Sequence, residues 1–260
     1  MMGNSLIQIS RENNFCIVTL NRSDKLNTLT PKMLDELEQH ARAIEADKEI
    51  RAVILTGSGT RAFCVGADIN EWAALQPLDM WRHWVKRGHQ VFDQWAYLRQ
   101  PVIAAINGHA FGGGLELAIA ADIRLSTHSA QFALPEASIA TCPGWSGTQR
   151  MVRLIGASHT KYLALSGQRI SASQALQSGL VHEVVDGDAL MARAKALASE
   201  IALKAPVSLQ LTKQLVNAAA GEDRDSTLEA MAGALAASTE DAKEGVSSFK
   251  EKRNALYRGY

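Results

Sequence analysis

Two apolar runs near the start of the chain predict a pair of strands. Residues 6–9 and 15–20 are rich in β-branched and other apolar side chains, and the polar link at 11–14 predicts a hairpin between them. Thr30 and Pro31 then predict the start of a helix, with Thr as the N-cap and Pro at the first helical position. That helix carries one apolar stripe, which consists of Met33, Leu34, Leu37, Ala41 and Ile44.

Further along, short apolar runs alternate with turns rich in small residues. Residues 52–55 and 102–106 each predict a buried strand, because both runs are apolar and bounded by turn-forming residues. Residues 115–121 are rich in Ala and Leu, which favour a helix. Short strands are predicted at 123–126 and 130–134. The first two-thirds of the chain therefore mixes strands with helices.

Residues 71–99 are helical in character and rich in aromatic side chains. Five large side chains fall roughly on one face of such a helix, namely Trp81, Trp84, Val91, Phe92 and Trp95. Most of them are expected to pack in the core. Their closeness in sequence to two glycine-rich loops raises a second possibility, that some of them line a substrate pocket.

The last third of the chain is predicted to be mainly helical. A helix is predicted at 158–166 and ends at Gly167, and a capping box at Ser171 and Gln174 begins a helix that ends at Gly179. A last strand is predicted at 181–185. The helices that follow are interrupted near Pro206 and at 221–225. From residue 189 onward only helices are expected. The pattern predicts a core domain at 1–188 and a helical region at 189–260.

Two glycine-rich loops suggest chemistry. Three consecutive glycines, 112–114, stand between the strand at 102–106 and the helix at 115–121, with Glu116 in the first helical turn. Such a helix entry presents unpaired backbone N–H groups at the positive end of the helix dipole. A second loop, 61–69, has the same character. Two loops of this kind can each supply one N–H donor to a single oxygen, which is how an oxyanion hole is built.

Other interpretations of these residues stay open at this point. The glycines could serve tight packing of a helix on a sheet, with Glu116 as an ordinary first-turn charge. Glu136 follows Pro135, a favourable opening for a helix that needs no chemistry. A nucleotide-phosphate loop is disfavoured, because neither Gly-Lys-Ser/Thr nor a complete Gly-x-Gly-x-x-Gly motif occurs.

Composition narrows the class of protein. The chain has 260 residues, of which 47% are hydrophobic, and its 27 basic residues equal its 27 acidic ones, so no excess charge favours nucleic acid or an anionic membrane. Cys16, Cys64 and Cys142 are widely spaced among apolar neighbours, which predicts buried free thiols in a reducing compartment. No apolar run approaches the length of a membrane span, and residues 1–11 do not resemble a secretory signal. We expect a cytoplasmic protein without a metal site.

Taken together, the motifs resemble those of the enoyl-CoA hydratase/isomerase (crotonase) family. The matching stretches cover nearly the whole chain, in order and with the right spacing. They are 63–69, 105–118, Phe132 with Pro135 and Glu136, 143–150 around Pro143, Gly144, Gly147 and Arg150, and 171–181. The resemblance implies an α/β fold, a crotonase-like spiral of ββα turns with a helical C-terminal trimerisation region. It also implies a homo-oligomer, either a trimer or a dimer of trimers.

The resemblance further implies a coenzyme A thioester as substrate, with coenzyme A entering as part of that substrate and no separate cofactor. By motif position, the backbone N–H groups of Ala67 and Gly113 would hold the thioester oxygen. Glu116 and Glu136 fill both acid positions of the hydratases, which favours hydration of a 2-enoyl-CoA. By analogy, Glu116 would chiefly activate water and Glu136 would protonate the α-carbon. Neighbouring acids can share one proton, and the sequence does not say which of them carries it.

The same resemblance implies a set of residues that bind the substrate and its coenzyme A part. It consists of Arg61, Gly66, Asp68, Ile69, Gly144, Trp145, Phe249 and Lys252. The chain departs from the family pattern at Asn70, where several relatives carry Lys, and at Trp145 and Ser146, which replace small residues. A Trp at this place is expected to narrow the acyl pocket or to tilt the attacking water, so the acyl preference stays open.

Two rival functions remain. The first is an isomerase, or another acyl-CoA enzyme of the same family, that shifts a double bond with one Glu as proton shuttle. The second is a non-catalytic or RNA-binding member of the fold. The balanced charge and the presence of both glutamates argue against the second.

Overall fold

The structure, a computed structural model, describes residues 5–260. The chain divides into two compact units, a first that ends at Gln210 and a second at Leu211–Tyr260. The sequence predicted the boundary at 188/189 instead. The difference lies in α8 (Leu190–Ala202), which packs on the main sheet through Leu190, Ala194 and Ala198 and so belongs with the first unit.

The main sheet has six strands in the order β1-β2-β3-β5-β7-β10. Only β1 and β2 pair antiparallel, as the predicted hairpin, and every other neighbouring pair is parallel. The strands of this sheet are β1 (Ile7–Glu12), β2 (Phe15–Leu20), β3 (Ala52–Gly57), β5 (Val102–Ile106), β7 (Ile123–Thr127) and β10 (Glu183–Val185). All the strands predicted from apolar runs in this sheet are confirmed, with shifts of up to three residues at their ends.

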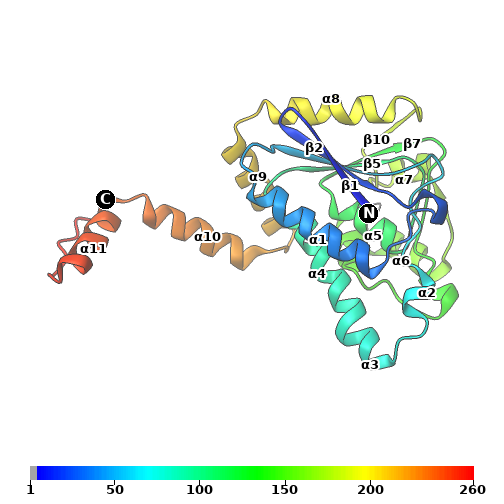
Figure 1. The fold of residues 1–260 in the computed structure, drawn as a ribbon, viewed down its shortest axis with the longest axis horizontal. Coiled ribbons are helices and arrows are strands. Elements are labelled where there is room, and N and C mark those ends of the chain that lie inside the picture. The colour runs from blue at the N-terminus through cyan, green and yellow to red at the C-terminus, as the bar shows by residue number, and fades with distance from the viewer. Residues whose placement is uncertain (1–4) are drawn as a thin grey trace. The chain divides into compact units, whose positions relative to one another are not determined.

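The two faces of the main sheet bury different neighbours, because successive side chains of a strand alternate between faces. Phe15 and Ile17 pack under α8, whereas Cys16 and Val18 face the larger core on the other side. In Figure 1, α8 lies along one side of this sheet, and α1 and α5 lie on the other. This double coverage explains why the central strands are apolar runs without alternation.

A smaller sheet of four strands has the order β4-β6-β8-β9. Its strands are β4 (Ala62–Cys64), β6 (His109–Phe111), β8 (Gln131–Ala133) and β9 (Ile170–Ser171). Each of β3, β5 and β7 in the main sheet is followed along the chain by a strand of the smaller sheet and then by helix. These repeating ββα turns form the predicted spiral.

The remaining elements are helices. They are η1 (Ser23–Lys25), α1 (Pro31–Ala46), α2 (Ile69–Trp72), α3 (Pro77–Asp79), the π-helix η2 (Met80–Val85), α4 (Lys86–Tyr97), α5 (Gly113–Ala120), η3 (Glu136–Ile139), α6 (Gly147–Ser166), α7 (Ala172–Gln177), α9 (Pro206–Ala219), α10 (Arg224–Ala237) and α11 (Glu240–Glu251). The Thr30 cap of α1 and the capping box at Ser171 are both present as predicted. All five residues of the α1 stripe are buried.

Two predictions about burial are wrong in part. Trp81 does not share the buried face of Phe92 and Trp95, since 67% of its surface is exposed. Cys142 is exposed, whereas Cys16 and Cys64 are buried as predicted. Burial raises the pKa of the Cys16 and Cys64 thiols to about 12, so these two side chains are inert at neutral pH.

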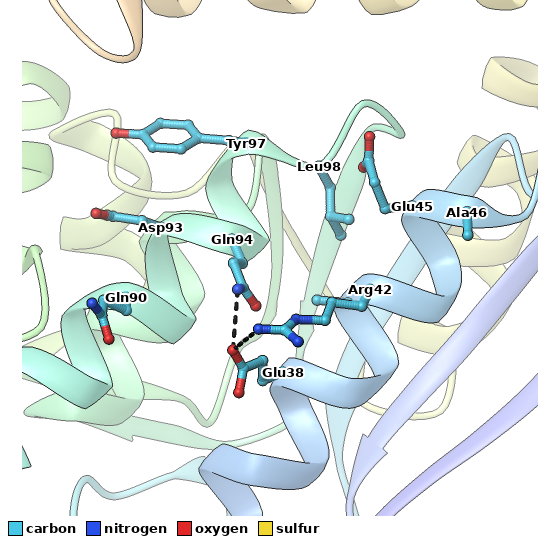
Figure 2. A pocket seen from close by; sticks show the side chains of 10 residues that line it. Glu38, Arg42, Glu45, Ala46, Gln90, Asp93, Gln94, Tyr97 and Leu98 are labelled. Atoms are coloured by element: carbon cyan, nitrogen blue, oxygen red, sulfur yellow. Dashed lines mark hydrogen bonds and ion pairs between the residues drawn. The ribbon is translucent and has the colours of Figure 1, made fainter. Parts of the chain in front are cut away.

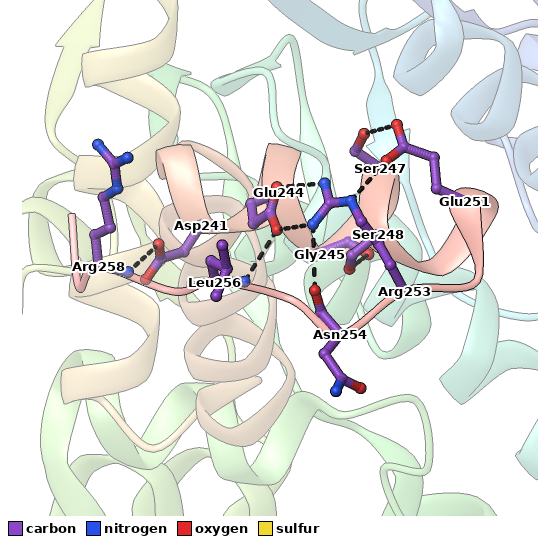
Figure 3. A network of polar contacts seen from close by, with 10 residues as sticks. All are labelled: Asp241, Glu244, Gly245, Ser247, Ser248, Glu251, Arg253, Asn254, Leu256 and Arg258. Atoms are coloured by element: carbon purple, nitrogen blue, oxygen red, sulfur yellow. Dashed lines mark hydrogen bonds and ion pairs between the residues drawn. The ribbon is translucent and has the colours of Figure 1, made fainter.

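The second unit contains a short tail that folds back on its last helix. Figure 3 shows Arg253 between Glu244 and Glu251, with the backbone of Leu256 bound to Glu244 and that of Arg258 bound to Asp241. The backbone N–H groups of Glu240 and Asp241 in turn donate to the carbonyl of Tyr260. The end of the chain is thereby fixed to the start of α11.

Candidate active site

The smaller sheet gathers three loops at one edge. Its strands β4, β6 and β8 are parallel neighbours, so their carboxyl ends lie side by side. Ala67 follows β4, Gly113 follows β6, and Glu136 follows β8. Three residues that are far apart in the sequence therefore meet because of the sheet order.

The Ala67 and Gly113 amides border one small space. A methyl group on Gly113 would lie 3.7 Å from the Ala67 nitrogen, and one on Gly66 would lie 3.6 Å from the Gly113 nitrogen. Gly66 and Gly112 have φ angles of +105° and +49°, so each precedes its amide in a conformation that favours glycine. Within residues 5–260, neither of the two N–H groups donates to a protein acceptor. Their predicted role as donors to a ligand oxygen stays a prediction.

Glu116 lies in the first turn of α5 with only 2% of its surface exposed. Its Oε1 accepts hydrogen bonds from the backbone N–H groups of Trp145 and Gly147, each at 2.9 Å. Burial raises the pKa of Glu116, and these N–H donors act in the opposite direction because they favour the ionised form. The side chain of Glu116 is therefore held by the first turn of α6 and the loop before it.

Glu136 has a different environment. It opens η3 with 8% of its surface exposed, and its Oε2 has no hydrogen-bond partner in the part of the chain that the structure describes. Its Oε1 lies 2.9 Å from the position of a methyl group on Gly112. Burial, reinforced by the negative charge of Glu116, raises the pKa of Glu136 to about 7. This carboxyl is thus able to hold a proton near neutral pH.

Trp145 forms an aromatic wall beside these groups. Its ring centroid lies 5.4 Å from that of Trp84 and 5.2 Å from that of Phe92. A methyl group on Gly113 would lie 2.9 Å from two ring carbons of Trp145, and one on Gly88 would overlap the indole. The ring therefore packs directly against the backbone of both glycines.

Known proteins resemble this chain over nearly its whole length. The family model described as enoyl-CoA hydratase/isomerase matches residues 10–259. The chain belongs to the enoyl-CoA hydratase/isomerase family. It is 40% identical to a short-chain-enoyl-CoA hydratase from Clostridium acetobutylicum, over 94% of each chain. It is 35% identical to a crotonyl-CoA hydratase from Syntrophomonas wolfei, over 96% of this chain and 97% of that one.

Among solved structures, an enoyl-CoA hydratase from Bacillus anthracis superposes with a TM-score of 0.81 at 38% identity, over 98% of this chain and 100% of that one. The crotonase-type α/β fold predicted from the motifs is thereby confirmed, as is the helical character of the C-terminal region. The sequence resemblance to this family, and to its enoyl-CoA hydratases in particular, is confirmed as well.

Other predicted substrate-binding residues are dispersed. Asp68 is buried and forms an ion pair at 2.7 Å with Arg22, which lowers the pKa of its carboxyl, and it also caps α2. Ile69 is 49% exposed, and the exposed side chain of Arg61 donates to the Ser23 carbonyl at 3.3 Å. For Asp68 the structure shows a structural role. Its part in binding substrate, like that of Arg61 and Ile69, stays a prediction.

Gly144 lies in the loop that also carries Trp145, close to Val85 of η2. Phe249 and Lys252 lie in the second unit, where Phe249 is 85% exposed and Lys252 ends α11 in a left-handed conformation. Their predicted contact with coenzyme A also stays a prediction.

Sequence reasoning missed the residues that hold the loop at 144–147. Asp93 of α4 accepts a hydrogen bond from the Ser146 hydroxyl at 2.9 Å and pairs with Arg150 at 2.7 Å. The unusual Ser146 in the motif around Gly144 and Gly147 was the available signal. Asp93 carried none, because a single carboxylate within a helical stretch is usually a solvated charge.

Asp93 also lines a groove between α1 and α4. Figure 2 shows Gln90, Asp93, Gln94 and Tyr97 of α4 on one side and Glu38, Arg42 and Glu45 of α1 on the other. The groove has a volume of about 740 Å³, and none of the predicted site residues lines it. It is therefore separate from the candidate active site.

Over residues 5–260, no cluster of three His, Cys, Asp or Glu side chains is arranged to hold a metal ion. Among the helices in that same range, none is long and apolar enough to span a membrane.

Proposed function

We propose that this protein is an enoyl-CoA hydratase, which adds water across the 2,3 double bond of a 2-enoyl-CoA to give a 3-hydroxyacyl-CoA. The hydratase names of its relatives support this activity. One observation carries the proposal further. Two buried glutamates with contrasting environments, Glu116 and Glu136, lie next to two backbone amides that donate to no acceptor in the described part of the chain.

In the proposed mechanism, the thioester oxygen binds to the N–H groups of Ala67 and Gly113. Addition of water to the β-carbon builds negative charge on that oxygen as an enolate forms. Two fixed N–H donors stabilise this charge, and loss of one such donor typically costs about 2.7–4 kcal/mol of transition-state stabilisation. The donors are backbone groups, so no side chain is needed for this part of the reaction.

The two acids then divide the proton transfers. The backbone donors at Oε1 favour the charged form of Glu116. Glu116 takes a proton from the attacking water while the oxygen of that water bonds to the β-carbon. Glu136, whose raised pKa favours its protonated form, gives its proton to the α-carbon as the enolate collapses. A proton passed from Glu116 back to Glu136 restores the starting state.

Coenzyme A enters this scheme as part of the substrate, and the scheme requires no separate cofactor. Arg61, Gly66, Asp68, Ile69, Gly144, Trp145, Phe249 and Lys252 are proposed to line the site of the acyl-CoA. We further propose that the protein acts in the cytoplasm as a homotrimer or a dimer of trimers, as the family resemblance suggests.

The test is hydration of a four-carbon 2-enoyl-CoA, followed by the loss of its enoyl-thioester absorbance. Replacement of either Glu116 or Glu136 by Gln is expected to lower kcat by about 10²–10⁴-fold, because each removes one proton transfer. Glu12→Gln is a matched control, since Glu12 pairs with Lys195 on the surface of the first unit. Near wild-type activity in either site variant would refute the assignment.

The rivals give different results in the same assay. An isomerase would convert a 3-enoyl-CoA to a 2-enoyl-CoA faster than it hydrates the latter. A non-catalytic member would act on neither thioester. Retention of both glutamates is the observation that favours hydration over both rivals.

A further inference from the structure

The loop at 144–147 is held from two opposite sides. On one side, the N–H groups of Trp145 and Gly147 donate to Glu116. On the other side, the hydroxyl of Ser146 donates to Oδ1 of Asp93 at 2.9 Å. The residue between the two Glu116 donors is thus the one that Asp93 binds.

Ser146 is in an unusual position for a serine. Its φ is +69°, in the left-handed region that glycine adopts without steric cost, and it is only 5% exposed. It stands at the N-cap of α6, where a serine hydroxyl normally accepts a hydrogen bond from the helix backbone. Here it makes no such cap, and Gly147, the first residue of the helix, donates instead to Glu116. Helix capping therefore does not explain the hydroxyl.

Asp93 is held in turn by two basic side chains. Buried Arg150 of α6 donates to the same Oδ1 at 2.7 Å, and Nε2 of His89 lies 3.1 Å from Oδ2. Asp93 therefore ties α4 both to the loop and to the first turns of α6. Figure 2 shows its side chain on α4 beside that of Gln90.

From this arrangement we infer that Asp93, through the hydroxyl of Ser146, is a positioning residue for the hydration reaction. It fixes the loop so that the N–H groups of Trp145 and Gly147 point at Glu116. The inference rests on the proposed function, because Glu116 is the base of that mechanism. Loss of the hydrogen bond lets the loop relax, and Glu116 then loses part of the donor set that favours its charged form.

The first experiment compares Ser146→Ala and Ser146→Gly in the hydration of a four-carbon 2-enoyl-CoA. We expect kcat to fall about five- to tenfold in both, the value of one hydrogen bond, with KM changed less than twofold. Ser146→Gly relieves the backbone strain, so a loss in that variant reports the hydroxyl alone. The acidic limb of the kcat/KM profile, which reports the base in the free enzyme, is expected to move to higher pH.

The second experiment tests the route through Asp93. Asp93→Ala is expected to lower kcat as Ser146→Ala does, and the double variant is expected to be no slower than the slower single variant. Asp93→Asn keeps an oxygen that accepts from Ser146 and should restore most of kcat. Glu38→Gln is the control, because Glu38 of α1 forms an ion pair with Arg87 of α4 away from the loop. It should lower thermal stability without moving the acidic limb.

The charged groups that act on Glu116 in these profiles are Glu136 of η3 and Arg150 of α6. Wild-type kcat in both Ser146 variants, an unmoved acidic limb, or additive effects in the double variant would each overturn the inference. If one of these results is obtained and the wild-type protein still hydrates the substrate, the inference is wrong but the proposed function stands. Absence of hydration by the wild type would count against the proposed function itself.

Discussion

At the scale of single residues, the two glutamates of the site differ by their hydrogen-bond partners. Oε1 of Glu116 receives backbone donors from the loop before α6, whereas Oε2 of Glu136 has no partner within residues 5–260. Burial disfavours the charged form of Glu136, because that form loses hydration, and the negative charge of Glu116 acts in the same direction. Two chemically identical side chains thereby become suited to opposite proton transfers.

This difference predicts a pH-dependent stability. Glu136 has a pKa of about 7 in the folded protein against about 4.3 in an unfolded chain, so the folded state binds the extra proton between these values. Stability is then full below pH 4 and falls as the pH rises towards 7, by on the order of 2–3 kcal/mol. Glu136→Gln removes this titration. We expect the free energy of unfolding, measured with urea, to fall from pH 4.5 to pH 8 in the wild type more than in Glu136→Gln. The difference between the two proteins should change by on the order of 2–3 kcal/mol over this range.

Glu12→Gln serves as the control for this measurement, since Glu12 is a surface carboxylate. A constant difference between Glu136→Gln and the wild type across this pH range would show that Glu136 titrates normally.

Trp145 predicts a preference for short acyl chains. Its ring packs on Gly113, whose amide is proposed to hold the thioester oxygen, and it is backed by Trp84 and Phe92. We therefore expect an acyl chain that starts at this amide to meet the indole soon after the β-carbon. Trp145→Ala should raise the ratio of kcat/KM for a ten-carbon over a four-carbon 2-enoyl-CoA at least tenfold, since each buried CH₂ contributes about 0.8 kcal/mol.

Trp81→Ala is the matched control for chain length, because Trp81 is an exposed tryptophan in the π-helix η2. If Trp145→Ala loses activity on both chain lengths in proportion, the indole does not limit the acyl pocket.

At the scale of elements, local signals predicted the starts of helices well. Thr30 accepts from the N–H group of Met33, and Ser171 accepts from that of Gln174. Each hydrogen bond joins residues three positions apart, so it can be predicted from the local sequence. The same is true of the buried strands, because apolar runs between turn residues need no distant information. Most of the main sheet was predictable for this reason.

Local sequence patterns did not predict the structure where it depends on distant residues or on irregular turns. The segment at 71–99 is not one helix, because α2, α3 and the π-helix η2 precede α4. The π-helix does not keep the α-helical repeat of 3.6 residues per turn. Trp81 therefore does not lie on the same face as Phe92 and Trp95, and it is exposed. The pairing of Asp93 with Ser146, 53 positions apart, follows from packing of α4 against the loop and from no local pattern.

The tail after α11 predicts a local effect of one carboxylate. Glu244 pairs with Arg253 and accepts from the Leu256 amide at 2.9 Å (Figure 3). The hydrogen bond from Arg253 lowers the pKa of Glu244 to about 2. Glu244→Gln should speed hydrogen exchange at the Leu256 amide, as measured by NMR. The Leu256 amide should be better protected against exchange in the wild type than in the variant. This difference should disappear only as the pH falls from about 4.3 towards 2, where Glu244 becomes protonated.

Lys243→Gln provides a comparison on the same helix, since Lys243 pairs with Glu240 near its start. Equal exchange rates at Leu256 in wild type and Glu244→Gln would mean that the tail is held by other contacts, such as those of Asp241.

At the scale of the whole molecule, the second unit leaves much apolar surface exposed. In α10 only Thr227 is buried among fourteen residues, while Leu228 and Leu235 are 54% and 72% exposed. Single exposed apolar residues are ordinary, but several on adjoining helices typically mark an interaction surface. The other exposed large hydrophobic residues described in this unit are Leu211, Leu215, Val216, Val246, Phe249, Leu256, Tyr257 and Tyr260. This surface agrees with the proposed assembly into trimers, which its burial between copies would stabilise.

The last prediction therefore concerns mass in solution. The chain has a mass of 28.1 kDa, and sedimentation equilibrium should give three or six times that value for the wild type. Leu228→Lys combined with Leu235→Lys places two charges on the apolar side of α10 and should shift the mass towards a single chain, because an unpaired buried charge is strongly disfavoured. Glu229→Lys, at the adjacent position of the same helix, should leave the mass unchanged. A wild type that sediments as one chain would contradict the assembly, and a double variant that keeps the larger mass would place the contact elsewhere than α10.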